Sequence, residues 1–546
     1  MPFSGPPMDP SPINVSVWNW LFSQDLPSDR GFISSTTSNL LSLSTIKRQS
    51  ILLSASLTRL HALLPHQVIA IVSSNSTLYP LPLFAASRLG CVVTCLPPDS
   101  HPDDLAYYFR EAGVVLVFCD GGSVERVRKA GGDAGLGREK VVLFEEEWDG
   151  REMTVKELVK EGEDMKRLGQ TVKEWMPEGR ADDICAFLAF SSGTTGRPKA
   201  VRISHTNVIS QLRQVKMVTR PGVCNTVLGV LPFYHITGLV HLLHLPFLLH
   251  QSLVVVENFT MKNMLEAVTQ FRCTELWVVP PLLIRLLSDP LVSQYDLSHV
   301  TQFDTGAAPL SPGIITKLSK RFPEVAIRQS WGMTESTSVL TTTPPGLDTW
   351  ENAASVGKLA PGTTVKIVDP DTGKEVEVGK QGEIWAKGPQ VSLGYLNNPS
   401  ATSSTYDSSG YLHTGDLGHI SPTGFIYITS RLKEILKVRG HPVPPTLLED
   451  TLLTHPCVSD CAVIGVPDEY SGEVPQAWVV LNQVGIERGE ELMRQELGRL
   501  VEGRRERHMW LKGGILFVEE VPKSKAGKIL RRVLKERAER MGKAKL

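Results

Sequence analysis

Short apolar runs alternate with stretches of helical length along the first part of this chain. The apolar run at residues 68–72 precedes such a stretch at 78–89, and the run at 114–119 precedes another at 123–130. Strands that alternate with helices form βαβ units, in which the strands are parallel and the helices cover the faces of the sheet. The pattern therefore predicts an α/β fold built on a mainly parallel sheet.

The remainder of the chain predicts further folding units. Its 546 residues exceed one ordinary hydrophobic core and indicate about three to four units. After residue 360, strand-like pieces at 365–368 and 382–387 are separated by turn signals, as in an antiparallel β unit. From residue 431 onward an α+β pattern ends in a basic helix, expected over residues 528–539. We predict a boundary near Ser430 between domains of residues 1–430 and 431–546, with a β-rich subdomain at about 360–430.

Composition and charge argue against two classes of protein. Lys and Arg total 57 and Asp and Glu total 58, so nucleic acid is not an expected partner. Residues 227–250 carry no Lys, Arg, Asp or Glu and are long enough to span a bilayer. Pro232, Pro246 and four histidines make a lipid-facing helix unfavourable, so we expect buried core and no transmembrane segment. The eight cysteines lack zinc-site spacing, which favours buried thiols in a reducing compartment.

The segment FSSGTTGRPK at residues 190–199 has the chemistry of a phosphate loop. Its two glycines let the backbone approach an anion closely, and its hydroxyls and Lys199 supply donors and a positive charge. It is not a Walker A loop, because the glycines are three apart and Ala200 follows the lysine. A surface turn rich in Ser, Thr and Gly is the simpler alternative, but the pattern is far more specific than turn composition.

This segment resembles the phosphate loop of the adenylate-forming superfamily, which includes acyl-CoA synthetases, plant hydroxycinnamate:CoA ligases, beetle luciferases and peptide-synthetase adenylation domains. Further segments resemble motifs of that superfamily in its order: LPFYHITG (231–238), TGAAPL (305–310), QSWGMTE (329–335), YLHTGD (411–416), SRLKE (430–434) and PKSKAGKIL (522–530). The resemblance is to the acyl-CoA synthetase and 4-coumarate:CoA ligase-like branch. It implies a large N-terminal domain of two mainly parallel sheets with helices and a β-barrel-like subdomain, followed by a small mobile α+β domain.

The resemblance also implies roles for individual residues. Lys528 is expected to be the principal catalytic lysine of adenylate formation, His235 to gate the acyl pocket, and Lys437 to act in thioester formation. Glu335 is expected to associate with Mg²⁺, a hard cation that prefers oxygen ligands. The residues expected to hold ATP or CoA are Ser191, Ser192, Gly193, Thr194, Thr195, Gly196, Lys199, Gln329, Ser330, Trp331, Thr334, Asp416, Arg431, Lys433, Arg439 and Gly440. The residues expected to line the acyl pocket are Thr237, Gly306, Ala307, Ser338 and Val339.

Several residues depart from the pattern of the superfamily. Ser330 stands where Gly is usual, which narrows the pocket floor, and Trp331 stands where Tyr is more frequent and offers a flat face to adenine. Ser430 replaces a usual Asp, and Pro442 stands where some relatives carry Gln. These last two departures leave open how the nucleotide end of CoA is held.

The motif around the gating histidine favours a plain carboxylic acid as substrate. Residues 233–237 lack the Asp with which amino-acid-activating members hold an ammonium group, and Thr237 stands where hydroxycinnamate ligases often carry Tyr. The small residues of the pocket favour a medium or branched acyl chain, or an arylacetate. We therefore expect an ATP-dependent carboxylic acid:CoA ligase of fatty acid or secondary metabolism, which forms an acyl-adenylate and then an acyl-CoA thioester.

Two alternative functions remain open. One is an acyl-AMP ligase that loads a carrier protein. Lys437 and Arg439 argue against this ligase, because they match residues that the superfamily uses with CoA. The other is a non-catalytic ATP-binding relative, which is expected to lack one of Lys528, Glu335 and Asp416. A luciferase-type oxygenase finds no positive sign in the sequence.

The chain ends in Ala544-Lys545-Leu546. A small residue, a basic residue and a terminal Leu match a common variant of the peroxisomal targeting tripeptide. The alternative is a lysine-rich tail that ends in Leu by chance, in which case a cytoplasmic enzyme is expected. We predict a peroxisomal enzyme whose tail binds the import receptor.

Overall fold

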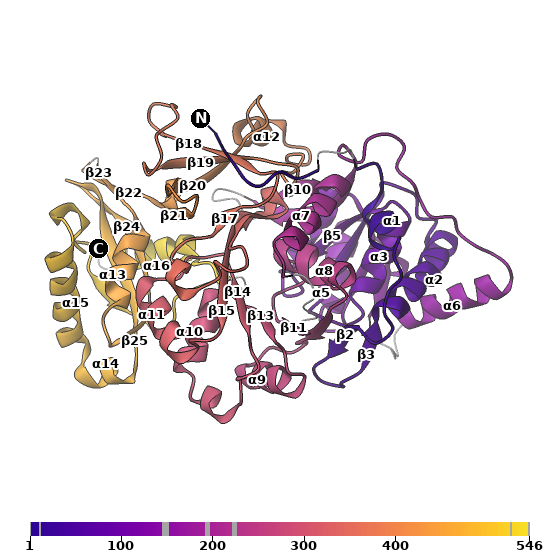
Figure 1. The fold of residues 1–546 in the computed structure, drawn as a ribbon, viewed down its shortest axis with the longest axis horizontal. Coiled ribbons are helices and arrows are strands. Elements are labelled where there is room, and N and C mark those ends of the chain that lie inside the picture. The colour runs from indigo at the N-terminus through magenta and orange to yellow at the C-terminus, as the bar shows by residue number, and fades with distance from the viewer. Residues whose placement is uncertain are drawn as a thin grey trace.

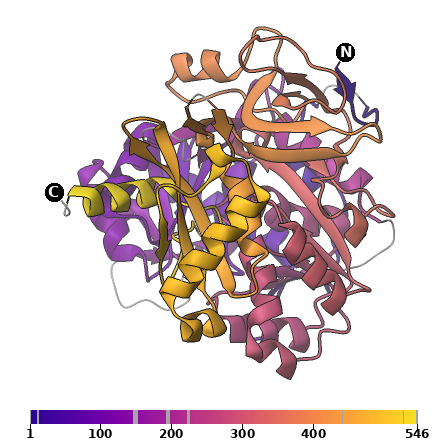
Figure 2. The same cartoon turned by 90° about the vertical axis from the view of Figure 1, so that its left-hand side faces the viewer.

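The computed structural model describes residues 2–9, 13–144, 152–191, 197–220, 226–439, 441–524 and 527–543. Within these residues the strands form four sheets. Figure 1 shows helix-covered sheets in the N-terminal part, with the yellow C-terminal part at one end beside α10 (Pro280–Ser288) and α11 (Pro312–Arg321). Seen from that end, the C-terminal helices and strands lie in front of the N-terminal part (Figure 2).

A seven-stranded sheet forms the first layer, in the order β10-β9-β5-β4-β6-β7-β8. Its strands are β4 (Val68–Val72), β5 (Val92–Leu96), β6 (Val114–Cys119), β7 (Val141–Leu143), β8 (Met153–Thr154), β9 (Cys185–Ser191) and β10 (Lys199–Ser204). Neighbours are parallel except for β10, which runs antiparallel to β9. Two of these strands, β4 and β6, coincide with the predicted apolar runs, because strands covered on both faces are continuously apolar.

A nine-stranded sheet forms the second layer, in the order β17-β16-β15-β14-β13-β11-β12-β2-β3. Its strands are β2 (Gly31–Ser34), β3 (Leu40–Ser42), β11 (Thr226–Gly229), β12 (Ser252–Val255), β13 (Glu275–Trp277), β14 (Gln302–Thr305), β15 (Ala326–Met333), β16 (Ser338–Thr342) and β17 (Lys358–Leu359). Strands β15 to β2 are parallel, and the pairs at both ends of the sheet are antiparallel. The carboxyl ends of parallel strands share one edge, where ligands bind in open α/β sheets.

Helices and short helical turns connect these strands. They are α1 (Val17–Leu21), α2 (Leu43–His61), α3 (Pro80–Arg88), α4 (Pro102–Ala112), α5 (Val124–Asp133), η1 (Arg138–Lys140), α6 (Val155–Arg167), α7 (His205–Met217), η2 (Gly238–Leu242), α8 (Leu243–Leu249), α9 (Met261–Gln270), η3 (Pro290–Gln294), η4 (Thr334–Ser336) and η5 (Trp350–Asn352). The predicted helices at 78–89 and 123–130 correspond to α3 and α5. Side-chain caps define some starts: Ser204 accepts a hydrogen bond from the backbone N–H of Asn207, so α7 begins directly after β10.

An antiparallel five-stranded sheet follows, in the order β1-β18-β19-β20-β21. Its elements are β1 (Phe3–Ser4), β18 (Thr364–Val368), β19 (Gly382–Lys387), α12 (Pro399–Thr405), β20 (Leu412–Ile420) and β21 (Ile426–Arg431). Its buried side chains pack with Trp331 and Leu340 from the edge of the nine-stranded sheet. This sheet corresponds to the predicted β-rich unit. Its hydrophobic core includes Trp331 and therefore connects the sheet with β15.

The C-terminal part has its own sheet and hydrophobic core. Its elements are η6 (Leu432–Glu434), β22 (Leu436–Val438), β23 (His441–Val443), α13 (Pro445–Leu453), β24 (Val458–Asp468), β25 (Gly472–Leu481), α14 (Gln483–Arg488), α15 (Glu490–Arg504), η7 (Arg507–Met509), β26 (Ile515–Phe517) and α16 (Arg531–Lys543). Strand β21 ends at Arg431 and β22 begins at Leu436. We therefore propose that the domain boundary lies near Ser430, at the end of β21.

The structure corrects the start of the basic C-terminal helix. The helix expected from residue 528 begins at Arg531. Gly527 has a φ of +80°, outside the helical region, and Lys523 pairs with Ile529 as an isolated β-bridge. These features hold residues 527–530 in a loop, so Lys528 precedes the helix.

The uncharged segment at residues 227–250 is divided among β11, η2 and α8 and is largely buried, as predicted. Gly238 has no room for a side chain, because a Cβ there would lie 2.0 Å from the carbonyl oxygen of Pro232. None of the described helices combines the length and the apolar character that crossing a bilayer requires.

Candidate active site

The ends of the phosphate loop lie at the tip of a hairpin. Ser191, the last residue of β9, is paired with Lys199, the first residue of β10. The ammonium of Lys199 lies 5.0 Å from the centre of the Tyr395 ring. Five predicted members of the loop, Ser192, Gly193, Thr194, Thr195 and Gly196, are outside the described residues.

A buried carboxylate lies beside this hairpin. Glu335 is 5% exposed, and its Oε1 accepts hydrogen bonds from the Ser191 hydroxyl at 2.8 Å and the Tyr395 hydroxyl at 2.9 Å. Burial, followed by the charge of Glu335, raises the pKa of Tyr395, so this hydroxyl remains a donor. Two hydroxyl donors on one oxygen orient the carboxylate.

The donor set around Glu335 fits a magnesium ion bound mainly by phosphate groups. Its Oε2 makes no hydrogen bond to another described residue, and no cluster of three His, Cys, Asp or Glu suited to a metal occurs among the described residues. Magnesium is usually held by one or two carboxylates together with substrate phosphates, not by an all-protein cage. Glu335 is therefore suited to supply one ligand to a cation that arrives with a nucleotide.

A second buried carboxylate lies where β20 and β21 pair. Asp416 is 4% exposed and faces Arg431 in the strand register. Its Oδ2 accepts a hydrogen bond of 2.8 Å from the Trp331 indole, and its Oδ1 lies 3.2 Å from Nε of Arg431. Burial raises the pKa of this carboxyl, while Arg431, the indole and Lys528 oppose the shift. Asp416 thus joins strands β15, β20 and β21 at one point.

Lys528 is held against the N-terminal part by the backbone around it. A Cβ on Gly527 would lie 3.0 Å from Cδ of Pro281, so only glycine lets the loop approach the start of α10 this closely. Ser524 closes the loop, because its backbone N–H donates to the Lys528 carbonyl at 2.8 Å and its hydroxyl accepts from the Lys528 N–H at 3.2 Å.

The charge environment of Lys528 shows which groups it faces. Burial lowers the pKa of its ammonium and Arg431 adds to that effect, whereas Glu434, Asp416 and Glu335 raise it. Lys528 is half-buried, and the charges of both buried carboxylates act on its ammonium. The structure therefore brings together Lys528, Asp416 and Glu335, which are far apart in the sequence.

The predicted acyl-pocket residues are partly gathered in the structure. The hydroxyls of Thr237 and Ser338 are 3.2 Å apart, and the backbone N–H of Val339 donates to Gln211 at 2.7 Å. A Cβ on Gly306 would lie 2.8 Å from the Ser330 carbonyl oxygen, so Gly306 packs directly against the next strand.

Ala307 and His235 are the other two residues predicted at the acyl pocket. Ala307 is exposed, with a φ of +67°. His235 begins the helical segment, since its carbonyl accepts from the N–H of Leu239 at 2.8 Å. Burial lowers the pKa of His235, which keeps the imidazole neutral.

Comparison with known protein families identifies the chain. The family model described as AMP-binding enzyme matches residues 26–396, and the model described as AMP-binding enzyme C-terminal domain matches residues 447–528. The chain belongs to the AMP-binding enzyme family. The predicted membership in the adenylate-forming superfamily is thereby confirmed.

Individual relatives of this AMP-binding enzyme are named as CoA ligases. "Probable CoA ligase CCL5" of Humulus lupulus is 34% identical over 477 residues, which cover 86% of this chain and 83% of the relative. "Peroxisomal OPC-8:0-CoA ligase 1" of Arabidopsis thaliana is 32% identical over 97% of this chain and 94% of its own. ATP-bound MatB from Rhodopseudomonas palustris has a similar solved structure, with a TM-score of 0.83, 25% identity, and coverage of 96% and 99% of the two chains. These names agree with the predicted class of acid–thiol ligase.

Some predicted nucleotide ligands of this AMP-binding enzyme make contacts within the protein. Gln329 donates its side-chain amide to the Ala353 carbonyl, and Ser330 donates its hydroxyl to Oγ1 of Thr342 at 3.0 Å. Thr334 is half-buried in η4, directly before Glu335.

The predicted thioester-forming residues contact the C-terminal sheet. The Lys437 side chain is exposed, and its backbone N–H donates to Oε2 of Glu473 at 3.2 Å. The Arg439 guanidinium lies 4.3 Å from the centre of the Tyr470 ring. Lys433 is exposed in η6, and Gly440 is outside the described residues. None of the described contacts of these residues joins them to Lys528, Asp416 or Glu335.

Tyr395 is a site residue that sequence reasoning missed. It lies 60 residues from Glu335, on the segment that follows β19, and bonds the carboxylate only because the chain folds back onto β10. The isolated bridge between Val201 and Tyr395 creates this approach. No local sequence signal marks such a residue, since the contact depends on packing between distant segments.

Proposed function

We propose that this AMP-binding enzyme is an ATP-dependent carboxylic acid:CoA ligase that forms an acyl-adenylate and then an acyl-CoA thioester. The observation that carries the proposal is the loop that holds Lys528 against α10, where the charges of the buried carboxylates Asp416 and Glu335 raise the pKa of its ammonium. Adenylation brings two anions together, and a half-buried ammonium stabilises the charge that develops on the phosphate. The names of the curated relatives support the same chemistry.

In the first half-reaction, a carboxylate oxygen of the acid attacks the α-phosphorus of ATP, and the bond to pyrophosphate breaks. Lys528 neutralises charge on the carboxylate and phosphate oxygens. Asp416 accepts hydrogen bonds from the ribose hydroxyls, with Arg431 beside it, and Trp331 presents a flat face to the adenine. Magnesium, when bound with ATP at Glu335, supplies electrostatic stabilisation of the phosphate charge.

In the second half-reaction, the sulfur of CoA attacks the acyl carbon, and the bond from that carbon to the phosphate oxygen breaks, which releases AMP. Lys528 and Lys437 serve different half-reactions, because the C-terminal domain rotates between them about a hinge at Lys433. Arg439 and Gly440 contact CoA in the second arrangement. The exposure of Lys437 and its contacts within the C-terminal sheet support this division of roles.

Replacing Lys437 with alanine is expected to slow thioester formation by about 10²-fold while adenylation changes less than about fivefold. The reason is that the Lys437 side chain is exposed in this structure, whereas Lys528 is half-buried against α10. The measurement follows pyrophosphate exchange for the first step and acyl-CoA release from a preformed acyl-adenylate for the second.

Lys535→Ala is the matched control for this experiment. Lys535 Nζ lies 3.9 Å from Oε1 of Glu473, the residue that also contacts Lys437, so the control removes a neighbouring ammonium. Neither step is expected to change in this variant. Equal loss of both half-reactions in Lys437→Ala would contradict the two-site assignment.

The acid and the compartment are part of the proposal. The small side chains at Thr237, Gly306 and Ser338 support a medium or branched acid, or an arylacetate. The peroxisomal assignment rests on Ala544-Lys545-Leu546, which are outside the described residues, and one curated relative is named a peroxisomal ligase. The protein then binds the import receptor through its tail and acts in fatty acid or secondary metabolism.

Mass spectrometry of reaction products tests the proposed function. Purified protein is incubated with ATP, magnesium, CoA and a panel of fatty acids, branched hydroxy acids, arylacetates and cinnamates, and AMP release is followed. We expect an acyl-CoA product with stoichiometric AMP. An acyl-AMP without thioester from every active acid would instead favour a carrier-loading ligase, and release of no AMP from any acid would overturn the proposal.

A further inference from the structure

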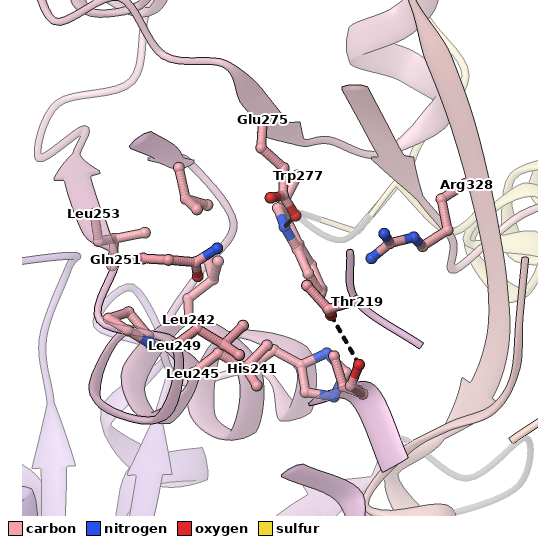
Figure 3. A pocket seen from close by; sticks show the side chains of 13 residues that line it. Thr219, His241, Leu242, Leu245, Leu249, Gln251, Leu253, Glu275, Trp277 and Arg328 are labelled. Carbon is pink, nitrogen blue, oxygen red and sulfur yellow. Dashed lines mark hydrogen bonds between the residues drawn. The ribbon is translucent and has the colours of Figure 1, made fainter. Parts of the chain in front are cut away.

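A small interior cavity lies among α7, the η2–α8 segment and the central strands of the nine-stranded sheet (Figure 3). Its volume is about 10 Å³, which suits one group the size of a water molecule. Figure 3 shows His241 on the same helical segment as Leu242 and Leu245, with Glu275, Trp277 and Arg328 across from them, and Thr219 and Gln251 also line the cavity. A few polar groups among predominantly apolar side chains are typical of a ligand site.

His241 is the polar residue of this cavity that most requires an explanation. It is 1% exposed, and neither of its ring nitrogens has a hydrogen-bond partner among the described residues. Its ring meets the edge of Trp277 at a centroid distance of 5.2 Å. Burial lowers the pKa of His241 to about 3, so the imidazole is neutral and offers one donor and one acceptor. Buried polar atoms without partners destabilise a fold, which makes a bound polar group the physical reason for a histidine here.

The charged side chains near the cavity already have partners of opposite charge or hydrogen-bond partners. Arg328 Nε lies 3.4 Å from Oδ1 of Asp304, and both side chains are 5% exposed. The Trp277 indole donates to Oε1 of Glu275 at 2.7 Å. A guanidinium with two carboxyl groups nearby leaves no net positive charge for an anion, and the neutral His241 adds none. The cluster therefore favours an uncharged oxygen over an ionised group.

His241 and Arg328 of the cavity, and Asp304 beside Arg328, lie close in the chain to residues of the proposed active site. The η2 segment carries His241 four residues after Thr237, β14 carries Asp304 two residues before Gly306, and β15 carries Arg328 two residues before Ser330. Residues two apart in a strand share a face, and residues four apart in a helix do the same. Thr237 and Gly306, predicted to line the acyl pocket, and Ser330, predicted to hold the nucleotide, thus share faces with the buried polar residues His241, Asp304 and Arg328. Along β15 the two positions are about 6–7 Å apart.

We propose that this cavity is the far end of the acyl site and that His241 receives an uncharged oxygen, a hydroxyl or a ketone, carried by the distal part of the substrate chain. The inference rests on the proposed function, because it names the class of acid that the ligase activates. An acid whose chain passes Thr237 and Ser330 carries this oxygen several carbons beyond its carboxyl group. A saturated chain end would leave the His241 nitrogens without partners.

Matched pairs of acids test this inference. Acids of graded length are compared as unsubstituted chains and as chains with a distal hydroxyl or ketone, and kcat/KM for AMP release is measured for each. The wild-type enzyme is expected to prefer the oxygen-bearing member of the best pair by at least about tenfold, because a site built to hydrogen-bond an oxygen discriminates against its absence. In His241→Leu this ratio is expected to fall by about tenfold or more, and His241→Asn is expected to restore part of it.

His244→Leu is the matched control. His244 is also buried in this segment, but it packs against Phe84 and Phe187 and its Nδ1 lies 2.8 Å from the Leu239 carbonyl oxygen. The preference ratio is expected to be unchanged in this variant, and melting temperatures report the fold of every variant. Three outcomes would overturn the inference while leaving the ligase function intact. They are an equal rate for both members of every pair, a preference for a distal carboxylate or ammonium, and an unchanged ratio in a folded His241→Leu. AMP release from no acid would overturn the proposed function, and this inference with it.

Discussion

Replacing Lys528 with alanine is expected to lower acyl-adenylate formation by about 10²- to 10³-fold, the effect of removing one preorganised stabiliser of transition-state charge. Lys528 is half-buried and feels the charges of two buried carboxylates, on a loop that Gly527 allows to approach α10. No second described lysine shares that position. Pyrophosphate exchange measures the loss directly, and conversion of a preformed acyl-adenylate to the thioester is expected to continue.

Lys523→Ala controls for loss of a lysine from the same loop. Its ammonium pairs with Asp460 at 2.7 Å within the C-terminal part, and part-exposed ion pairs contribute little. Adenylation is expected to change less than about fivefold in this control. If Lys523→Ala and Lys528→Ala slow adenylation equally, the loop as a whole matters and the assignment of Lys528 is wrong.

Replacing Asp416 with alanine is expected to raise the KM for ATP by about 10²-fold. Hydrogen bonds to a charged group contribute about 1.5–3 kcal/mol each, and the proposed role of Asp416 gives its carboxylate two such bonds from the ribose hydroxyls, both of which the truncation removes. The variant also leaves the Trp331 indole and Arg431 without their partner, so the orientation of Trp331, the residue proposed to face the adenine, is disturbed. Initial rates at graded ATP, with the acid saturating, measure the effect.

Asp416→Asn separates charge from shape in this experiment. The amide oxygen still accepts one hydrogen bond, so an intermediate KM for ATP is expected. Asp369→Ala is a control on the same sheet, since that side chain accepts backbone hydrogen bonds from Asp371 and Thr372 in an exposed turn. A rise in the KM for the acid without a rise for ATP would contradict a ribose-binding role for Asp416.

The sequence predicted the strands and the general fold because these depend on local patterns. The runs at residues 68–72 and 114–119 coincide with β4 and β6, and the piece at 382–387 coincides with β19. Short, continuous apolar runs such as the first two are typical of strands buried in parallel sheets. The start of α16 was misplaced, since Gly527 and the bridge from Lys523 to Ile529 favour a loop that basic composition does not reveal.

The sequence by itself determined the family, because motifs such as those of residues 190–199 and 522–530 are contiguous and specific. Only the tertiary structure decided which groups meet. It placed Tyr395 on Glu335, Trp331 and Arg431 on Asp416, and His241 in a cavity with Arg328. Such contacts join segments far apart in the chain, and their distances follow from how sheets and helices pack, which no local pattern of residues encodes.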